Sequence, residues 1–166
     1  MDINIASRSR TLVAGLLFML TLVMSPLIMA DKQDHDRKHE RECNGQEIVV
    51  HLKRHIEDLQ GAITATRLAT LMQSKSCDVT LFLTLGGVRL ADTRMPQDLV
   101  FGSDPMAPTL QQAVSAFQGL GGTVAVCPAC AGEIGLTPDD LIPGATIFGP
   151  DDIAELFIEA DKVLDF

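Results

Sequence analysis

The sequence predicts an α/β domain built around a mostly parallel β-sheet. Three observations lead to this prediction. Short apolar runs rich in β-branched residues alternate with segments whose apolar residues recur at helical spacing. The strand-like runs are continuously apolar, as in parallel strands that are covered on both faces. With 166 residues and 46% hydrophobic content, the chain can bury one core without disulfide staples.

The first 30 residues differ from the rest and predict export. Arg8 and Arg10 precede an uncharged apolar run over residues 11–30, which ends in the small residue Ala30. This pattern is typical of a cleaved signal peptide, and the run is also long enough for an uncleaved membrane anchor. Because the positive charges come first, we expect the remainder in the periplasm or otherwise outside the cytoplasm. Membrane contact is expected only through residues 11–30, if they are retained.

Residues 31–45 are predicted to be a charged linker. The stretch DKQDHDRKHERE is almost wholly charged and has no apolar face with which to pack. His35 and His39 stand four residues apart, a spacing that holds metal ions on helices, yet the segment lacks a third fixed ligand. We therefore expect a spacer and no metal site, with the folded domain covering residues 46–166.

The first half of this domain is predicted to begin with a strand, a helix and a second strand. The apolar run Glu47 to Leu52 suits a buried strand, and residues 63–72 then carry apolar side chains at helical spacing. The run Val79 to Leu85 is the second strand and stops at a Gly-Gly pair. Residues 86–108 form a long loop with one short helix, which covers a site or a subunit contact or is a plain surface excursion.

The second half continues the alternation. Leu110, Val114 and Phe117 mark a helix, after which residues 123–127 make a third buried strand. Pro150 is a typical first residue of a helix. The remaining predicted elements are a strand over 145–148, a helix over 153–160 and a last strand over 163–166.

Cys127 and Cys130 form a Cys-Pro-Ala-Cys turn directly after the third strand, and we expect the chemistry here. This is the carboxyl end of the sheet, where open α/β folds bind their ligands. Unpaired N–H groups at a helix start favour the thiolate, which is the nucleophile. The pair is also compatible with disulfide chemistry, half a zinc site or two inert buried thiols. Zinc is disfavoured because the chain has only one such pair, and a thioredoxin-type domain normally carries it after its first core strand.

Residues 124–166, with the earlier segments IVVHL and DVTLFLTLGGVRLA, resemble the DsrE/DsrF-like sulfur-relay family over about residues 47–166. The resemblance is specific at CPAC and DLIPG. It implies a flavodoxin-like three-layer fold with five parallel strands, and assembly into dimers, trimers or hexamers. It also implies a sulfur-carrying cysteine after the third strand, which Cys127 matches. In that role Cys127 exchanges persulfide sulfur with donor and acceptor proteins, and Cys130 resolves the persulfide or simply packs.

His51, Arg54 and His55 surround the carboxyl end of the first strand. In a 2-1-3 strand order this end lies next to the end of the third strand, so a histidine there would polarise Cys127 or hold an anion. Arg54 would bind an anionic sulfur species. The alternatives are structural, hydrogen-bonded histidines and a solvent-facing arginine.

The two remaining cysteines have a separate interpretation. Cys43 precedes the first strand and Cys77 the second, and adjacent parallel strands bring these starts together at the opposite end of the sheet. An oxidising compartment would favour a structural Cys43–Cys77 disulfide.

Composition excludes one class of partner and leaves several functions open. The net charge of -9, the lack of Trp and Tyr and the absence of a basic stripe argue against nucleic acid binding. We expect no cofactor. Three classes are compatible with the sequence: a sulfur carrier or sulfurtransferase, a thiol–disulfide oxidoreductase using Cys127 and Cys130, and a non-catalytic oligomeric binding module. Whether the protein is an enzyme stays open.

Overall fold

The computed structural model describes residues 43–104 and 106–166, which belong to one compact unit, Glu42–Phe166. The predicted export segment, the linker to residue 42 and the His35–His39 pair lie outside the described residues. Among the residues that are described, no helix is both long and apolar enough to cross a membrane.

Five strands form a single sheet in which every pair of neighbours is parallel, in the order β4-β3-β2-β1-β5. This confirms the predicted α/β class with a five-stranded parallel sheet. The strands are β1 (Glu47–Leu52), β2 (Asp78–Leu83), β3 (Thr123–Val126), β4 (Ala145–Ile147) and β5 (Lys162–Asp165). The helices are η1 (Ile56–Asp58), α2 (Leu59–Gln73), η2 (Leu85–Ala91), α3 (Leu110–Gly119), α4 (Pro128–Glu133), η3 (Pro138–Asp140) and α5 (Pro150–Glu159), where η marks a 3-10 helix.

The strand order corrects one expectation. β1 does not lie beside β3, because β2 pairs with β1 along its whole length, from Glu47 opposite Asp78 to Leu52 opposite Leu83. The other edge of β1 is occupied by β5, and the Lys53 N–H donates to the Phe166 carbonyl at 2.9 Å. With both edges of β1 paired, β3 adds to the free edge of β2 instead. The end of β1 therefore lies one strand further from the CPAC turn than expected.

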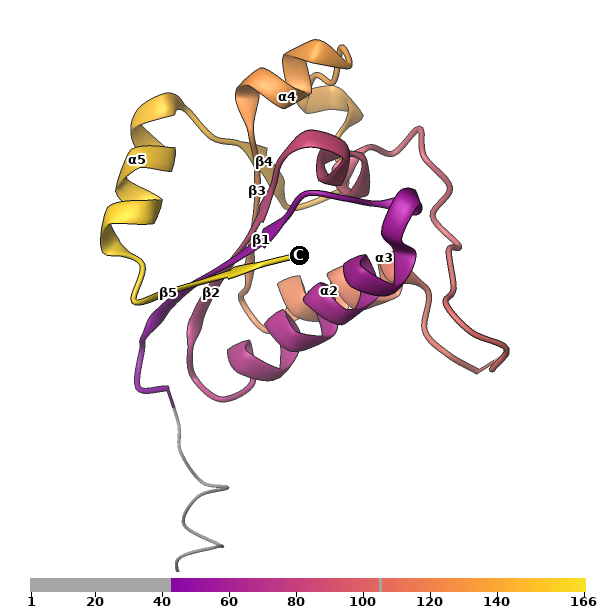
Figure 1. The fold of residues 1–166 in the computed structure, drawn as a ribbon, viewed down its shortest axis with the longest axis horizontal. Coiled ribbons are helices and arrows are strands. Elements are labelled where there is room, and N and C mark those ends of the chain that lie inside the picture. Colours follow the sequence, from indigo (N-terminus) through magenta and orange to yellow (C-terminus); the bar gives the residue numbers. More distant parts are fainter. Residues whose placement is uncertain (1–42, 105) are drawn as a thin grey trace, which may run out of the picture. The chain divides into compact units, whose positions relative to one another are not determined.

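The main core lies between the sheet and helices α2 and α3. Alternate residues of the central strands, such as Val50, Leu81 and Val124, are fully buried on this face and pack with Phe117 of α3. A smaller cluster forms on the opposite face. Figure 1 shows α5 on that side of the sheet, away from α2 and α3.

The face toward α5 is only partly covered, which differs from the expectation that both faces are buried. Val49, Phe82 and Ala125 are buried there, whereas Thr123 and Thr146 are exposed. The reason is that one helix of ten residues, α5, lies on this face and contacts mainly β1. The strands on the β4 side consequently carry threonines where a covered sheet would have aliphatic residues.

The second strand ends two residues before its predicted end. Leu85 adopts a φ of +49°, in the left-handed region that L-residues avoid, so the extended run stops and η2 begins. The helix η2 is the short helix expected in the long loop. Its start lies close to the end of β1, because a Cβ on Gly87 would lie 2.2 Å from the Leu52 carbonyl oxygen. Only glycine permits this approach.

Candidate functional site

Cys127 is held between the sheet and a helix. Its backbone N–H donates to the Leu83 carbonyl of β2 at 2.9 Å, which extends the β2–β3 pairing by one step. Its own carbonyl accepts from the Ala131 N–H at 2.9 Å and so starts α4, with Pro128 as the first helical residue. The side chain is half-buried and its thiol is free. This places a fixed but accessible sulfur at the carboxyl end of β3.

Cys130 lies one turn later and contacts both Cys127 and the turn after β2. Its thiol is also free and half-buried, and its sulfur accepts a hydrogen bond from the Leu85 N–H at 3.1 Å. Leu85 is the residue with the left-handed φ, and its apolar side chain is 62% exposed. Strained backbone of this kind is characteristic of functional sites, where the surroundings must hold it in place.

The environment keeps the Cys130 thiol protonated at neutral pH. Burial raises the pKa of Cys130, the Leu85 N–H opposes this rise, and a hydrogen bond with Cys127 together with the nearby charges of Cys127 and Glu133 raises the pKa further. A protonated Cys130 beside Cys127 can donate a hydrogen bond to a thiolate on Cys127. The arrangement therefore suits a division of roles, with Cys127 as nucleophile and Cys130 as the second thiol.

Cys127 belongs to the same face of the sheet as α5. It packs against the cluster of Val49, Phe82 and Ala125, whereas Cys130 packs against the main core. The extended pairing of β2 and β3 brings Thr84 level with Cys127. Thr84 is also extended, with φ -132° and ψ 168°, so its side chain follows that of Phe82 on the α5 face.

His51 lies on this face too, next to Thr84 rather than next to Cys127. Its Nε2 is 2.7 Å from the Thr84 hydroxyl, and its Nδ1 is 2.8 Å from a carboxylate oxygen of Asp165. Lys53 makes an ion pair with the same carboxylate at 2.8 Å. Burial lowers the pKa of His51, and the hydrogen bond and charge of Asp165 oppose this shift. Hydrogen bonds therefore link polar side chains from β5 through β1 to the residue after β2, at the carboxyl ends of the strands.

His55 is buried and Arg54 faces solvent, which are the structural alternatives that the sequence left open. His55 is 2% exposed, its Nδ1 has no hydrogen-bond partner among the described residues, and its backbone N–H donates to Glu57 at 2.9 Å. Burial lowers the pKa of His55, which the nearby Glu57 carboxylate opposes. Arg54 is exposed. Within the described residues, neither side chain makes a hydrogen bond to Cys127.

Cys43 and Cys77 form a disulfide at the opposite end of the sheet, with 4.7 Å between their Cα atoms. The Cys43 N–H donates to the Lys75 carbonyl at 2.8 Å, so the backbone before β1 is already held against the turn before β2. Cys77 is 3% exposed. The disulfide joins the starts of two neighbouring strands, as the sequence positions predict.

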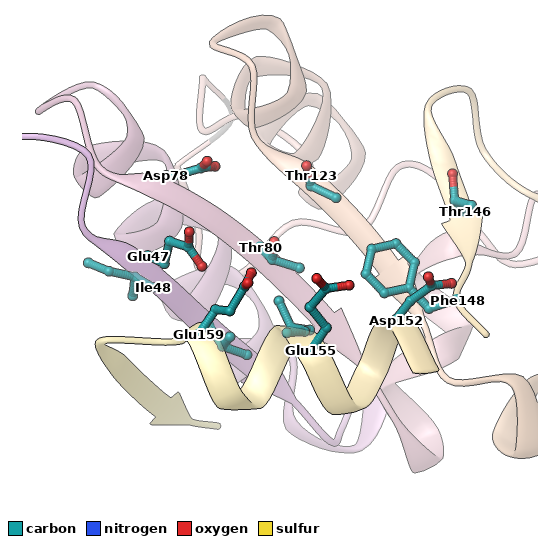
Figure 2. A pocket seen from close by; sticks show the side chains of 12 residues that line it. Glu47, Ile48, Asp78, Thr80, Thr123, Thr146, Phe148, Asp152, Glu155 and Glu159 are labelled. Atoms are coloured by element: carbon teal, nitrogen blue, oxygen red, sulfur yellow. The ribbon is translucent and has the colours of Figure 1, made fainter. Parts of the chain in front are cut away.

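A hollow of about 510 Å³ opens on the α5 face, toward the starts of the strands. Figure 2 shows Glu155 and Glu159 of α5 along one side of it, with Glu47 and Asp78 toward the end where Glu159 lies. Every ionisable side chain that lines it is acidic, and loss of hydration together with the neighbouring Glu159 carboxylate raises the pKa of Glu47. No cysteine lines this hollow.

Metal binding has no support in the part of the chain that the structure describes. No group of three or more His, Cys, Asp or Glu side chains there is arranged to hold an ion. Within these residues, the Cys127–Cys130 pair has no further ligands with which to complete a tetrahedral zinc site.

Three residues at the carboxyl edge were not predicted from the sequence: Thr84, Leu85 and Asp165. A polar residue at the end of an apolar strand is a usable signal for Thr84. Asp165 has no such signal, because it is 114 residues from His51 and reaches it only through the pairing of β1 with β5. A leucine in the left-handed region is too rare to predict from a pattern.

Comparison with known proteins identifies relatives of this domain. Residues 46–166 match the model of the DsrE/DsrF-like family. The crystal structure of the ychN protein from E. coli is similar, with a TM-score of 0.58 and 24% identity over 73% of this chain and 99% of that chain. MTH1491 from Methanobacterium thermoautotrophicum, a protein of unknown function, has a TM-score of 0.54 and 18% identity over the same shares of the two chains. No curated protein matches the chain. The two structural likenesses show the fold alone.

Proposed function

Because the chain belongs to the DsrE/DsrF-like family, we propose that it is a sulfur carrier in which Cys127 takes up sulfane sulfur as a persulfide. Membership of this family suggests a sulfur-relay type of function. The observation that supports Cys127 as the carrier is its free, half-buried thiol at the carboxyl end of β3, beside a second free thiol. An accessible thiol with a fixed backbone is what transfer between proteins requires.

The proposed uptake is a thiol exchange. The Cys127 thiolate attacks the outer sulfur of a donor persulfide, a new S–S bond forms as the donor's S–S bond breaks, and the donor leaves as a thiol. The proton lost by Cys127 goes to that thiol. For release, the Cys130 thiol attacks the Cys127 sulfur and expels hydrogen sulfide, which leaves a Cys127–Cys130 disulfide. An external dithiol then restores both thiols.

The proposal includes a location outside the cytoplasm. It is supported by the apolar run at residues 11–30 and by the Cys43–Cys77 disulfide, since disulfides persist mainly in oxidising compartments. The proposal also includes a homo-oligomer. Exposed apolar side chains of α5 and β5, Phe157, Ile158 and Val163, support self-association along this edge.

A second candidate function is reduction or formation of disulfides in other proteins. The observation that favours it is the contact between the two free thiols, because such a pair can close on itself. It differs from the sulfur carrier in requiring both cysteines for every turnover. It also requires no persulfide on either of them.

The two functions are separated by mass spectrometry after incubation of the purified protein with inorganic polysulfide. We expect one added sulfur on Cys127 in the wild type and a longer-lived one in Cys130→Ser, because the thiol that releases sulfide is missing. Cys127→Ser should take up none. Sulfur carried by Cys130 in Cys127→Ser, or none on the wild type, would contradict the carrier. Reduction of a disulfide substrate that needs both thiols would then support the second function.

A further inference from the structure

Asp165, His51 and Thr84 form an unbroken chain of hydrogen bonds across three strands. Asp165 of β5 lies 2.8 Å from His51 Nδ1 on β1, and His51 Nε2 lies 2.7 Å from the hydroxyl of Thr84 after β2. Both contacts are as short as the strong hydrogen bonds found in proteins. None of the chemistry proposed so far uses this chain.

The protons along the chain follow from what each atom can donate. An ionised carboxylate only accepts, so the His51 Nδ1 carries a proton toward Asp165. In the neutral imidazole Nε2 is then the acceptor, and the Thr84 hydroxyl must donate to it. The lone pairs of the Thr84 oxygen remain free to accept a proton from another group.

The group placed to supply that proton is the Cys127 thiol. Thr84 and Cys127 occupy level positions on neighbouring strands, because the Leu83–Val126 pair is followed by the bond from the Cys127 N–H to the Leu83 carbonyl. Both residues are extended and belong to the α5 face. Neighbouring strands are about 4.8 Å apart, so side chains at level positions on one face are neighbours.

The surroundings of His51 suit a proton acceptor. The charged groups that face it are Asp165 from β5 and Lys53 from β1, while α5 contributes the ring of Phe157 and β2 that of Phe82. The Lys53 ammonium and loss of hydration act in opposite directions on Asp165, and the net effect lowers the pKa of Asp165. Burial lowers the pKa of His51. At neutral pH the carboxylate is therefore charged and the imidazole neutral.

We propose that Thr84, His51 and Asp165 form a proton relay that activates Cys127. The Cys127 thiol gives its proton to the Thr84 oxygen while the Thr84 proton passes to His51 Nε2, which leaves a thiolate and an imidazolium held by Asp165. The same proton returns through Thr84 to the departing thiol of the donor. The use of the relay in sulfur transfer rests on the proposed function. Thr84 is the residue placed level with the reacting thiol, and in this proposal it exchanges the proton with Cys127 directly, while His51 and Asp165 are positioning residues that act through it.

Alkylation of Cys127 by iodoacetamide tests the relay without any sulfur transfer. The full-length protein would carry Cys130→Ser in all variants, so that Cys127 is the free thiol that reacts. We expect Thr84→Val to slow alkylation at neutral pH by at least about tenfold, a modest share of what proton transfer contributes in enzymes. Thr84→Ser, which keeps the hydroxyl, should alkylate at about the rate of the variant with Thr84 intact. Thr80→Val is the matched control, because Thr80 lies on β2, four residues before Thr84 and on the same face, but lines the hollow instead.

The pH profile separates a relay from a purely structural role. His51 must be neutral to accept a proton, so alkylation should fall as the pH drops through the lowered pKa of His51, below the ordinary value of 6.5. His51→Gln and Thr84→Val should lack this step. An unchanged profile in Thr84→Val, or an equal loss in Thr80→Val, would overturn the relay. If polysulfide leaves no sulfur on Cys127 while the profile still depends on Thr84, the proposed function fails and the relay stands.

Discussion

Two pairs of cysteines lie at opposite ends of the same parallel sheet, and only one pair is bonded. Cys43 and Cys77 precede β1 and β2 and form a disulfide, whereas Cys127 and Cys130 follow β3 and remain free thiols. In a parallel sheet all strands begin at one end of the sheet and finish at the other. The stabilising disulfide and the reactive thiols therefore lie at opposite ends of the strands.

The difference between the pairs comes from what surrounds them. Cys77 is almost fully buried, and backbone hydrogen bonds hold the Cys43 segment against it, so the disulfide joins chain segments that are already in contact. Cys127 and Cys130 are half-buried in a turn, and the Leu85 N–H after β2 donates a hydrogen bond to the Cys130 sulfur. The end with the strand starts holds the chain by a disulfide, whereas the carboxyl end exposes thiols beside proton donors and acceptors.

The largest effect is expected from removing the disulfide. The bond closes a loop with a sequence separation of 34, and the entropy of closing such a loop in the unfolded chain amounts to about 4 kcal/mol. Cys43→Ala/Cys77→Ala should lose this much of the free energy of unfolding, measured by urea denaturation under oxidising conditions.

Removing the other pair is the matched control. Cys127→Ser/Cys130→Ser breaks no covalent bond and should change the free energy of unfolding by only about 1 kcal/mol. Alkylation of Cys127 should in turn be unaffected when the disulfide is removed, at denaturant concentrations where the variant is folded. Equal losses of unfolding free energy in the two double variants would contradict the claim that only the Cys43–Cys77 pair stabilises the fold.

A smaller effect is expected from Gly87, which holds the turn after β2 against the end of β1. The Cβ of Gly87→Ala would meet the Leu52 carbonyl oxygen at 2.2 Å, and backbone cannot rotate away as a side chain does. Forcing the two segments apart should cost about 2 kcal/mol in the free energy of unfolding. The control is Gly132→Ala in α4, where an added Cβ meets nothing within 4 Å. If Gly87→Ala unfolded at the wild-type urea concentration, η2 would be free to shift, and the Leu85 N–H would not be fixed in its hydrogen bond to Cys130.

The elements were predictable from the sequence because their cause is local. Apolar runs and helical spacing placed each strand and the larger helices within a few residues, and the CPAC turn after the third strand followed from the same periodicity. Strand order was not predictable in this way. The pairing of β5 with β1 depends on contacts between residues 114 apart in the sequence, and hydrophobic periodicity carries no information on such contacts.

The candidate site was predictable only as far as its sulfur atoms. The sequence carries no signal for the left-handed conformation of Leu85 or for its hydrogen bond to Cys130, because a leucine rarely adopts this conformation. Asp165 meets His51 because the last strand returns to the edge of the first. His51 itself was expected beside Cys127, and the intervening β2 places Thr84 between them. The groups that tune the thiols thus come from strands whose neighbours only the fold decides.

The smallest effect concerns the influence of one thiol on the other. Burial raises the pKa of Cys130, and Cys127 raises it further by a hydrogen bond and by its charge. Cys127→Ser should therefore lower the pKa of Cys130, measured from the pH dependence of its alkylation, while burial keeps it above the ordinary value of 9.0. Glu133→Gln should lower it by less, because Glu133 is the weakest of these causes. A pKa of Cys130 that stays fixed in Cys127→Ser would mean that the two thiols ionise independently. The Cys127–Cys130 pair would then lack the mutual influence on which the division of roles between nucleophile and second thiol is based.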